Sequence, residues 1–155
     1  TADHASAQTR LADYQSPVGY FEIPIFFYKP GADWHEMNPT IIQQIDIMPT
    51  ILGELNYNKP FLAYGRDIFR DRTRPFAFNY LDNTYQAFRG NYLLQFDGNR
   101  STGLFDFTTD RRLNVNLISQ LPDTAAAMES YLKAFIQQYN NRMVDDNLTV
   151  RGPKK

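Results

Sequence analysis

The sequence predicts a mixed α/β fold, and three stretches of the chain support this prediction. Residues 20–28 are apolar, aromatic or β-branched almost throughout, a composition typical of a buried strand. Between residues 75 and 107, short apolar segments alternate with turn residues, which is typical of an antiparallel meander. Residues 123–143 repeat apolar side chains at three- and four-residue spacing, which indicates one amphipathic helix.

The N-terminal part of the chain is predicted to hold an exposed loop followed by a strand. Residues 5–18 are mostly small and polar, and they therefore predict a loop. The run 20–28 predicts a central strand. Because proline has no backbone N–H, Pro24 is expected either at a bulge or at a position where the ladder needs no donor. This strand is expected to end in a turn at Pro30 and Gly31.

A short helix is expected from residue 49 to about residue 55. Pro49 suits the first helical position, where a backbone N–H would have no partner. Asp46 stands just before it and is expected to cap the helix by interacting with its free N–H groups. The arginines from Arg66 to Arg74 are interleaved with aspartates, which predicts a solvated turn and not a phosphate clamp.

The second half of the chain is expected to form a small antiparallel sheet. The predicted strands cover residues 76–80, 85–89, 92–96 and 104–107. Residues 110–121 predict a linking segment that tucks four apolar side chains inward, those of Leu113, Val115, Leu117 and Ile118. The helix that follows is expected to pack on a sheet through Leu132, Phe135, Ile136 and Tyr139.

Composition and charge narrow the possible partners and chemistry. The 155 residues carry a formal net charge of −1, with lysine and arginine spread along the chain, so nucleic acid is not an expected partner. The chain has no cysteine, which excludes disulfides and thiolate metal ligands within it. No apolar run reaches the length of a transmembrane helix, so this chain itself is expected to be soluble.

The candidate functional residues stand at the start of the chain, in the sequence Thr-Ala-Asp-His. Asp3 and His4 offer a carboxylate oxygen and an imidazole nitrogen side by side, a donor pair that suits zinc or manganese. A solitary Asp-His pair is more often part of a solvated turn, so this pair gains weight only from the motifs that follow it. His35, the second histidine, lies far along the chain from the other candidate ligands and is expected to be a surface residue.

Four motifs in series resemble the C-terminal part of the alkaline-phosphatase and sulfatase superfamily. They are Thr-Ala-Asp-His at 1–4, Ile-Pro-Ile-Phe-Phe-Tyr-Lys-Pro-Gly at 23–31, Gln-Ile-Asp-Ile-Met-Pro-Thr-Ile-Leu at 44–52 and Gly-Arg-Asp-Ile-Phe at 65–69. The version here is most similar to phosphoglycerol transferases of the lipoteichoic acid synthase type. The ending of the second motif, the Gln43-Gln44 doublet and Phe-Asn-Tyr at 78–80 favour that branch. The resemblance is close over roughly the first hundred residues and loose beyond them.

This resemblance implies an alkaline-phosphatase-like fold divided into three parts. Residues 1–73 would end the catalytic domain, residues 74–150 would form an antiparallel subdomain with the final helix, and residues 151–155 would be a tail. The resemblance further implies that Asp3 and His4 bind a divalent metal (manganese, zinc, calcium or magnesium). It also places Arg10 near the substrate as a candidate binding residue, although an ordinary surface arginine is the favoured interpretation. The other ligands and the nucleophile would lie upstream. No catalytic residue is therefore placed in this chain, and the isolated chain is expected to be inactive.

The resemblance also implies a substrate class, a partner and a location. The expected substrate is a phosphoester or sulfate ester, such as a glycerophospholipid-type phosphodiester, bound together with the missing N-terminal part of the same enzyme. The parent enzyme is expected to be anchored in the membrane with its catalytic domain outside the cytoplasm. Two alternatives stay open: an arylsulfatase fragment, and a non-catalytic structural or binding module.

Overall fold

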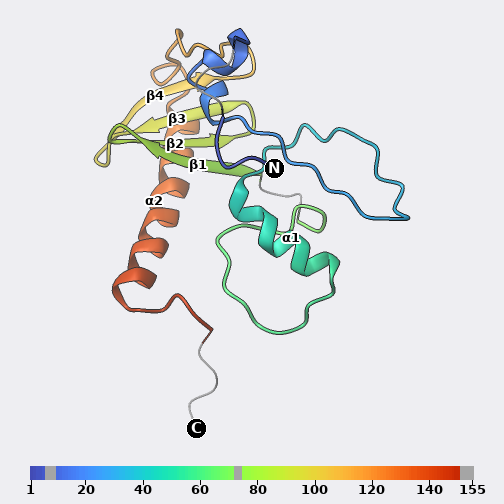
Figure 1. Ribbon diagram of the computed structural model, residues 1–155. Helices are drawn as coiled ribbons and strands as arrows, with labels where there is room; N and C mark the ends of the chain where they lie inside the picture. Colours follow the sequence, from blue (N-terminus) through green and yellow to red (C-terminus); the bar gives the residue numbers. More distant parts are fainter. Residues whose placement is uncertain (6–9, 72–74, 151–155) are drawn as a thin grey trace.

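A four-stranded antiparallel sheet lies between the long C-terminal helix and segments of the N-terminal half (Figure 1). The computed structural model describes residues 1–5, 10–71 and 75–150. The 3-10 helices are η1 (Ala12–Gln15), η2 (Gly19–Phe21) and η3 (Gln44–Asp46). The α-helices and strands are α1 (Ile47–Glu54), β1 (Phe76–Leu81), β2 (Thr84–Arg89), β3 (Tyr92–Phe96), β4 (Ser101–Asp106) and α2 (Pro122–Val144).

The sheet is a simple meander in which each strand pairs with the next one along the chain, in the order β1-β2-β3-β4. The turn between β1 and β2 consists of Asp82 and Asn83, whose φ angles are 50° and 60°. Two-residue hairpin turns of this twist need positive φ at both positions, and Asp and Asn tolerate that conformation. The predicted meander is therefore confirmed, and its strand boundaries agree with the prediction to within three residues.

Helix α2 covers one face of the sheet, as its amphipathic pattern predicts. Leu132 is fully buried against Leu94 and Leu104 of the sheet, and Ile136 packs against the same cluster. The ring of Phe135 lies 4.4 Å from that of Phe78. Tyr139 is the exception among the four predicted contacts, because it is 44% exposed and packs on Tyr64 instead of on the sheet.

The opposite face of the sheet is covered by segments from outside the meander. Phe88, Leu93 and Phe105 form a buried cluster there with Val18, and Ile41 packs against its margin. The prediction of an exposed loop over residues 5–18 is therefore wrong at its end, because an apolar sheet face must be covered by apolar side chains. Residues 6–9 of that predicted loop lie outside the described residues.

Only some of the apolar side chains in the segment between β4 and α2 point inward as predicted. Leu113 packs against the face that Val18 covers, and Ile118 packs against the α2 side of the sheet. Leu117 is half-buried, and its N–H donates to the carbonyl of Leu104 at 2.7 Å. Val115, in contrast, is 56% exposed, so its predicted inward position is wrong.

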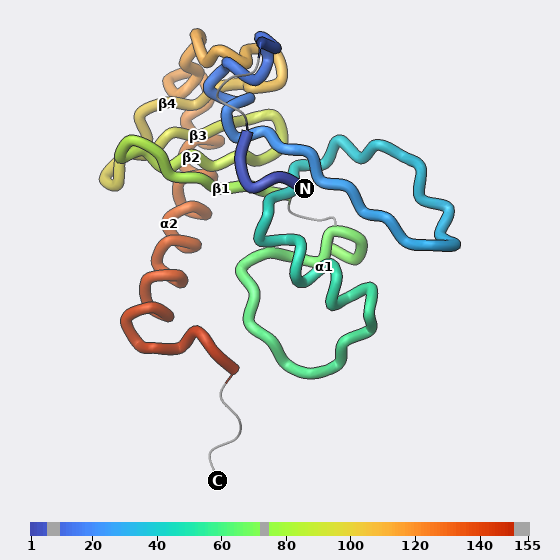
Figure 2. Tube along the Cα trace, viewed as in Figure 1, coloured from blue at the N-terminus to red at the C-terminus, as the bar shows by residue number. Residues whose placement is uncertain are grey.

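The predicted central strand at residues 20–28 is also wrong. It begins with η2 and continues as extended chain that pairs with no strand in the described part of the protein. Exposure alternates along it, and the outward side chains Phe26 and Tyr28 are 82% and 88% exposed. Figures 1 and 2 show the chain between η2 and η3 as a long loop that extends away from the sheet. A strand needs a neighbour at hydrogen-bonding distance, and no described segment supplies one.

Helix α1 begins and ends close to its predicted limits, at Ile47 and Glu54. Among the described residues, no helix is both long and apolar enough to cross a lipid bilayer. The predicted boundary between residues 73 and 74 and the predicted tail at 151–155 lie outside the described residues.

Candidate metal-binding turn

Asp3 and His4 form an exposed turn in which their side chains face one another. The backbone N–H of His4 donates to Asp3 Oδ1 at 3.0 Å, which occupies one carboxylate oxygen. The other oxygen, Oδ2, lies 3.7 Å from His4 Nε2. The two side chains are 89% and 79% exposed, so both potential ligand atoms are accessible from solvent.

A backbone carbonyl sets which nitrogen of His4 is free. Nδ1 lies 2.9 Å from the carbonyl oxygen of Ala5, so in the neutral ring Nδ1 carries the proton and donates it there. The lone pair of a neutral His4 is therefore on Nε2, the nitrogen that lies 3.7 Å from Asp3 Oδ2. This hydrogen bond, followed by the Asp3 carboxylate, raises the pKa of His4 above its ordinary value.

The donor pair fits part of a divalent metal site. Zinc bonds to nitrogen and oxygen are about 2.0–2.1 Å long, which separates two ligand atoms by about 3.3 Å at the tetrahedral angle. The 3.7 Å between Asp3 Oδ2 and His4 Nε2 is close to that spacing. Within the described ranges, no group of three or more His, Cys, Asp or Glu side chains is placed to hold a metal. The turn can therefore supply two ligands and needs further donors to complete a site.

Gln44 ties this turn to the rest of the protein. Its side-chain Nε2 donates to the carbonyl oxygens of Ala2 and Asp3, at 2.8 and 3.1 Å. The sequence pattern, in which Gln44 is one position of a motif, does not predict this contact. The two partners are 41 and 42 positions away, and no local pattern encodes such a contact.

The side chain of Asp46 does not cap α1, contrary to the prediction. It is 2% exposed, and its oxygens accept hydrogen bonds from Arg66 N (2.9 Å) and Gln43 N (3.1 Å). Asp46 is instead the last residue of η3, and its carboxylate completes a capping box of that helix by accepting the N–H of Gln43. Burial raises the pKa of the Asp46 carboxyl, and the hydrogen bonds from Arg66 N and Gln43 N oppose that rise.

Arg66 is buried as well, so the predicted solvated turn is wrong at this residue. It is 8% exposed, and its Nη2 donates to the carbonyl of Ile41 at 2.9 Å. Its Nη1 donates to the carbonyl of Asp71. These two carbonyls hold the guanidinium of Arg66 inside the protein. Arg72 and Arg74 lie outside the described residues.

Thr50 joins the same contacts from the second turn of α1. Its hydroxyl donates to the carbonyl of Asp46 at 2.6 Å and accepts the N–H of Ile68 at 3.2 Å. Gly65 packs so closely that a Cβ built there would lie 2.1 Å from the carbonyl oxygen of Ile45. The third and fourth motifs therefore serve to hold α1 against the loop that carries Arg66.

The remaining predicted site residues lie on the surface. Arg10 is exposed, and among the described residues no hydrogen bond or ion pair joins it to Asp3 or His4. Its role in substrate binding stays a prediction. The Nδ1 of His35 lies 2.9 Å from Asp33 Oδ1, and both side chains are highly exposed, at 73% and 95%, which fits the expected surface position.

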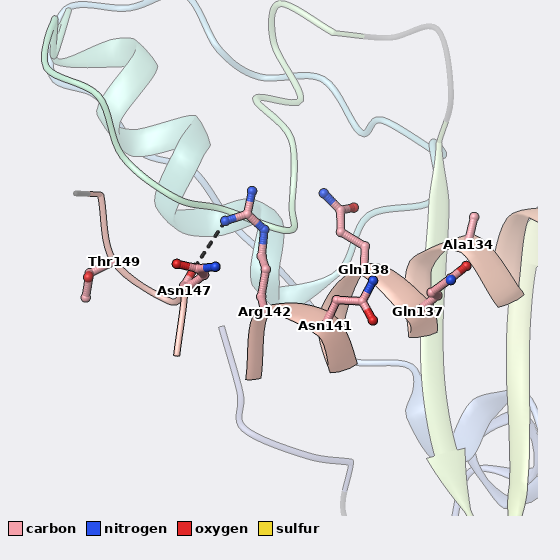
Figure 3. Close-up of a pocket in the computed structure, with 7 residues that line it drawn as sticks. All are labelled: Ala134, Gln137, Gln138, Asn141, Arg142, Asn147 and Thr149. Atoms are coloured by element: carbon pink, nitrogen blue, oxygen red, sulfur yellow. Dashed lines mark hydrogen bonds between the residues drawn. The ribbon is translucent and has the colours of Figure 1, made fainter. Parts of the chain in front are cut away.

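Two hollows in the described surface lie away from this turn. One, of about 630 Å³, is at the C-terminal end of α2, and Figure 3 shows polar side chains around it. Arg142 is its charged lining residue, and Nη1 of that side chain already donates to the carbonyl of Asn147 at 3.1 Å. The other, of about 350 Å³, lies between α1 and the loop that follows it. Neither hollow contains Asp3 or His4.

No protein-family model matches the chain, and no curated protein matches its sequence. The structure itself defines a mixed α/β protein with a four-stranded antiparallel sheet and a C-terminal helix.

Proposed function

We propose that the chain is the C-terminal part of a metal-dependent phosphoglycerol transferase, or of a related phosphatase or sulfatase, with an alkaline-phosphatase-like fold. The observation that carries this proposal is the geometry of Asp3 and His4. One carboxylate oxygen and one imidazole nitrogen lie 3.7 Å apart on exposed side chains, and the lone pair of neutral His4 is on that nitrogen. A divalent ion bound there would polarise an ester oxygen and activate the nucleophile.

The contacts between the four motifs also support the proposal. Gln44 of the third motif binds the backbone of the first, and Asp46 of the third binds Arg66 of the fourth. Phe27 of the second motif packs edge-on against Phe69 of the fourth, with their ring centroids 5.3 Å apart. Segments that are separate in sequence thus form one connected unit beside the candidate turn.

The distribution of apolar surface supports the proposal in a different way. Exposed large apolar side chains are concentrated between residues 11 and 61, where Phe26, Tyr28 and Met37 are each more than 80% exposed. An apolar surface of this kind is typical of a region that packs against another part of a protein. In the proposed enzyme, the covering part is the remainder of the catalytic domain, which would also supply the nucleophile and the missing ligands.

A metal titration of the 155-residue chain tests the proposed ligands. We expect weak binding of Mn²⁺ or Zn²⁺ and no turnover of phosphodiesters or sulfate esters, because two ligands leave an ion largely hydrated. His4→Ala is expected to abolish this binding. His35→Ala is a matched control, since it removes the other histidine beside an aspartate, and it is expected to change nothing. Equal loss in both variants would show non-specific surface binding.

Activity of the complete enzyme tests the assignment further. Asp3→Ala and His4→Ala are each expected to lower turnover by orders of magnitude while leaving the fold intact, because both remove a metal ligand. His35→Ala is expected to retain full activity. Full activity in either ligand variant would contradict the proposal and would favour a non-catalytic module.

A further inference from the structure

We infer that Gln44 is a positioning residue for the metal-binding turn, an inference that rests on the proposed function of Asp3 and His4. The Nε2 of Gln44 donates to the carbonyl oxygens of Ala2 and Asp3, at 2.8 and 3.1 Å. A primary amide carries two hydrogens on this nitrogen, so it can bind both carbonyls at once. The backbone that leads into both ligands is thereby held in place by one side chain.

The turn depends on this support because its other contacts are local. The carboxylate of Asp3 binds the N–H of His4, and the ring of His4 binds the carbonyl of Ala5. These contacts shape the turn but do not fix it relative to the rest of the chain. Among the hydrogen bonds and ion pairs of described residues, those from Gln44 are the ones that connect residues 1–5 to a distant segment.

Gln44 can act as a support because its own backbone is firmly held. It is the first residue of η3, and the last residue, Asp46, is buried and bonded to Arg66 N. The preceding residue, Gln43, accepts the N–H of Phe78 on β1 through its side-chain oxygen at 3.1 Å. The two adjacent glutamines therefore point to different partners, Gln43 to the sheet and Gln44 to the metal-binding turn.

The chemistry explains why such a support is useful. Groups that bind and orient metal ligands without touching the metal commonly change metal affinity by about 10- to 100-fold when they are removed. Here the support acts on the backbone, so it sets the position of the Asp3 carboxylate and the His4 ring together. A loosened turn would still contain both ligands, but they would spend less time in the geometry that a metal requires.

The test compares Gln44→Met with Gln43→Met in the 155-residue chain. Methionine has nearly the shape of glutamine but cannot donate, so Gln44→Met removes only the two hydrogen bonds to the turn. We expect faster backbone motion at Asp3 and His4 by ¹⁵N relaxation. We also expect about a tenfold loss of Mn²⁺ affinity, measured by broadening of the His4 ring signals. Gln43→Met is expected to lower the unfolding midpoint without changing either readout.

The second histidine separates positioning from general loosening. Broadening of the His35 ring signals by Mn²⁺ is expected to be the same in Gln44→Met as in wild type, because His35 lies outside the metal-binding turn. If wild type binds Mn²⁺ and Gln44→Met binds it equally well, the inference is overturned while the proposed metal ligands stand. Equal weakening by Gln43→Met also overturns it. If the His4 signals of wild type do not respond to Mn²⁺, both the inference and the proposed metal ligands fail.

Discussion

The buried carboxylate of Asp46 joins the stretch that forms η3 and α1 to the loop that carries Arg66. Its two side-chain oxygens accept N–H groups from Arg66 and Gln43, and its backbone carbonyl accepts the hydroxyl of Thr50. Buried polar groups of this kind contribute little when paired but cost much when one partner is removed. Even a substitution that keeps the shape of Asp46 is therefore expected to lower the stability of the fold.

Asp46→Asn is expected to lower the free energy of unfolding by about 1–3 kcal/mol, because one oxygen acceptor becomes an NH₂ group that faces a backbone N–H. Urea unfolding of the two proteins measures the difference. Asp33→Asn, at an aspartate whose side chain is 95% exposed, is the control and should change stability by less than about 0.5 kcal/mol. Equal stability of Asp46→Asn and wild type would contradict the role assigned to this carboxylate.

The turn predicted at Asp82-Asn83 is confirmed, whereas the helix cap predicted at Asp46 is wrong. The difference shows which features of single residues can be predicted from the sequence. A turn that needs positive φ at two adjacent residues is encoded by those residues themselves, so the hairpin was predictable. The partner of Asp46 is 20 positions away, and the choice between capping α1 and binding Arg66 N depends on tertiary packing. The donor pair at Asp3 and His4 was likewise visible locally, whereas its support by Gln44 was not.

The packing of α2 on the sheet depends on aromatic contacts as well as on leucines. Phe135 lies between the loop residue Tyr64, at 5.8 Å, and Phe78 of β1, at 4.4 Å between ring centroids. This residue therefore joins the C-terminal helix to both halves of the chain.

Phe135→Ala is expected to lower the free energy of unfolding by about 3 kcal/mol, since it removes a half-buried ring that packs on Tyr64 and Phe78. Tyr139→Ala, one turn later on α2 and 44% exposed, is the matched control and should cost clearly less. Chemical unfolding monitored by circular dichroism compares the two variants. A cost for Phe135→Ala no larger than that of the control would mean that the helix does not pack on the sheet through this residue.

A pH-dependent contact joins α2 to the start of β4. Glu129 Oε2 accepts the N–H and the hydroxyl of Ser101, at 3.1 and 2.6 Å, and Lys133 also binds the carboxylate. The hydrogen bonds from Lys133 and Ser101 lower the pKa of Glu129 below its ordinary value of 4.5. A lowered pKa in the folded state stabilises the fold above the unfolded value, and this stabilisation is lost as the pH falls through the folded value.

Glu129→Gln is expected to lower the free energy of unfolding by about 1–2 kcal/mol at neutral pH, because glutamine has a single acceptor oxygen and no charge. The difference from wild type should shrink as the pH falls below 4.5. Unfolding curves at a series of pH values measure this trend. Glu36→Gln, at an exposed glutamate in the long loop, should behave like wild type throughout. A difference that does not depend on pH would contradict the assignment.

Among the secondary-structure elements, local sequence patterns correctly predicted the meander and the helices. They wrongly predicted a strand at residues 20–28. Each hairpin of the meander carries its own turn residues, and α2 carries its own apolar stripe. A strand, in contrast, exists only if another strand binds it. Residues 20–28 have the composition of a strand and the alternating exposure of one, yet no described segment pairs with them.

Apolar side chains are covered in one part of the molecule and exposed in another. Both faces of the sheet have apolar cover, whereas Phe26 and Tyr28 in the chain between η2 and η3 are almost completely exposed. Figure 2 shows this part of the chain as a long loop that extends away from the sheet. Part of this loop is anchored, because Trp34 packs on Phe69 with ring centroids 5.0 Å apart. Substitutions at the exposed residues Phe26 and Tyr28 are therefore expected to change stability less than substitutions where the loop packs on Phe69.

Phe26→Ser and Tyr28→Ser are each expected to change the free energy of unfolding by less than about 0.5 kcal/mol, because little of either side chain is buried. Both should reduce the binding of a hydrophobic dye, since they remove exposed apolar surface. Phe69→Ser is the contrasting variant and should destabilise the chain, because the rings of Phe27 and Trp34 pack on it. A large loss of stability in Phe26→Ser would show that the loop is covered within this chain.

The contact of Gln43 with β1 has a consequence for how the sheet behaves in concentrated solution. β1 is an edge strand, and an edge strand with free N–H groups is a template onto which another chain can add. The side-chain oxygen of Gln43 occupies the N–H of Phe78, in the middle of that edge. Gln43 thus leaves one backbone donor fewer at the middle of this edge for a further strand to pair with.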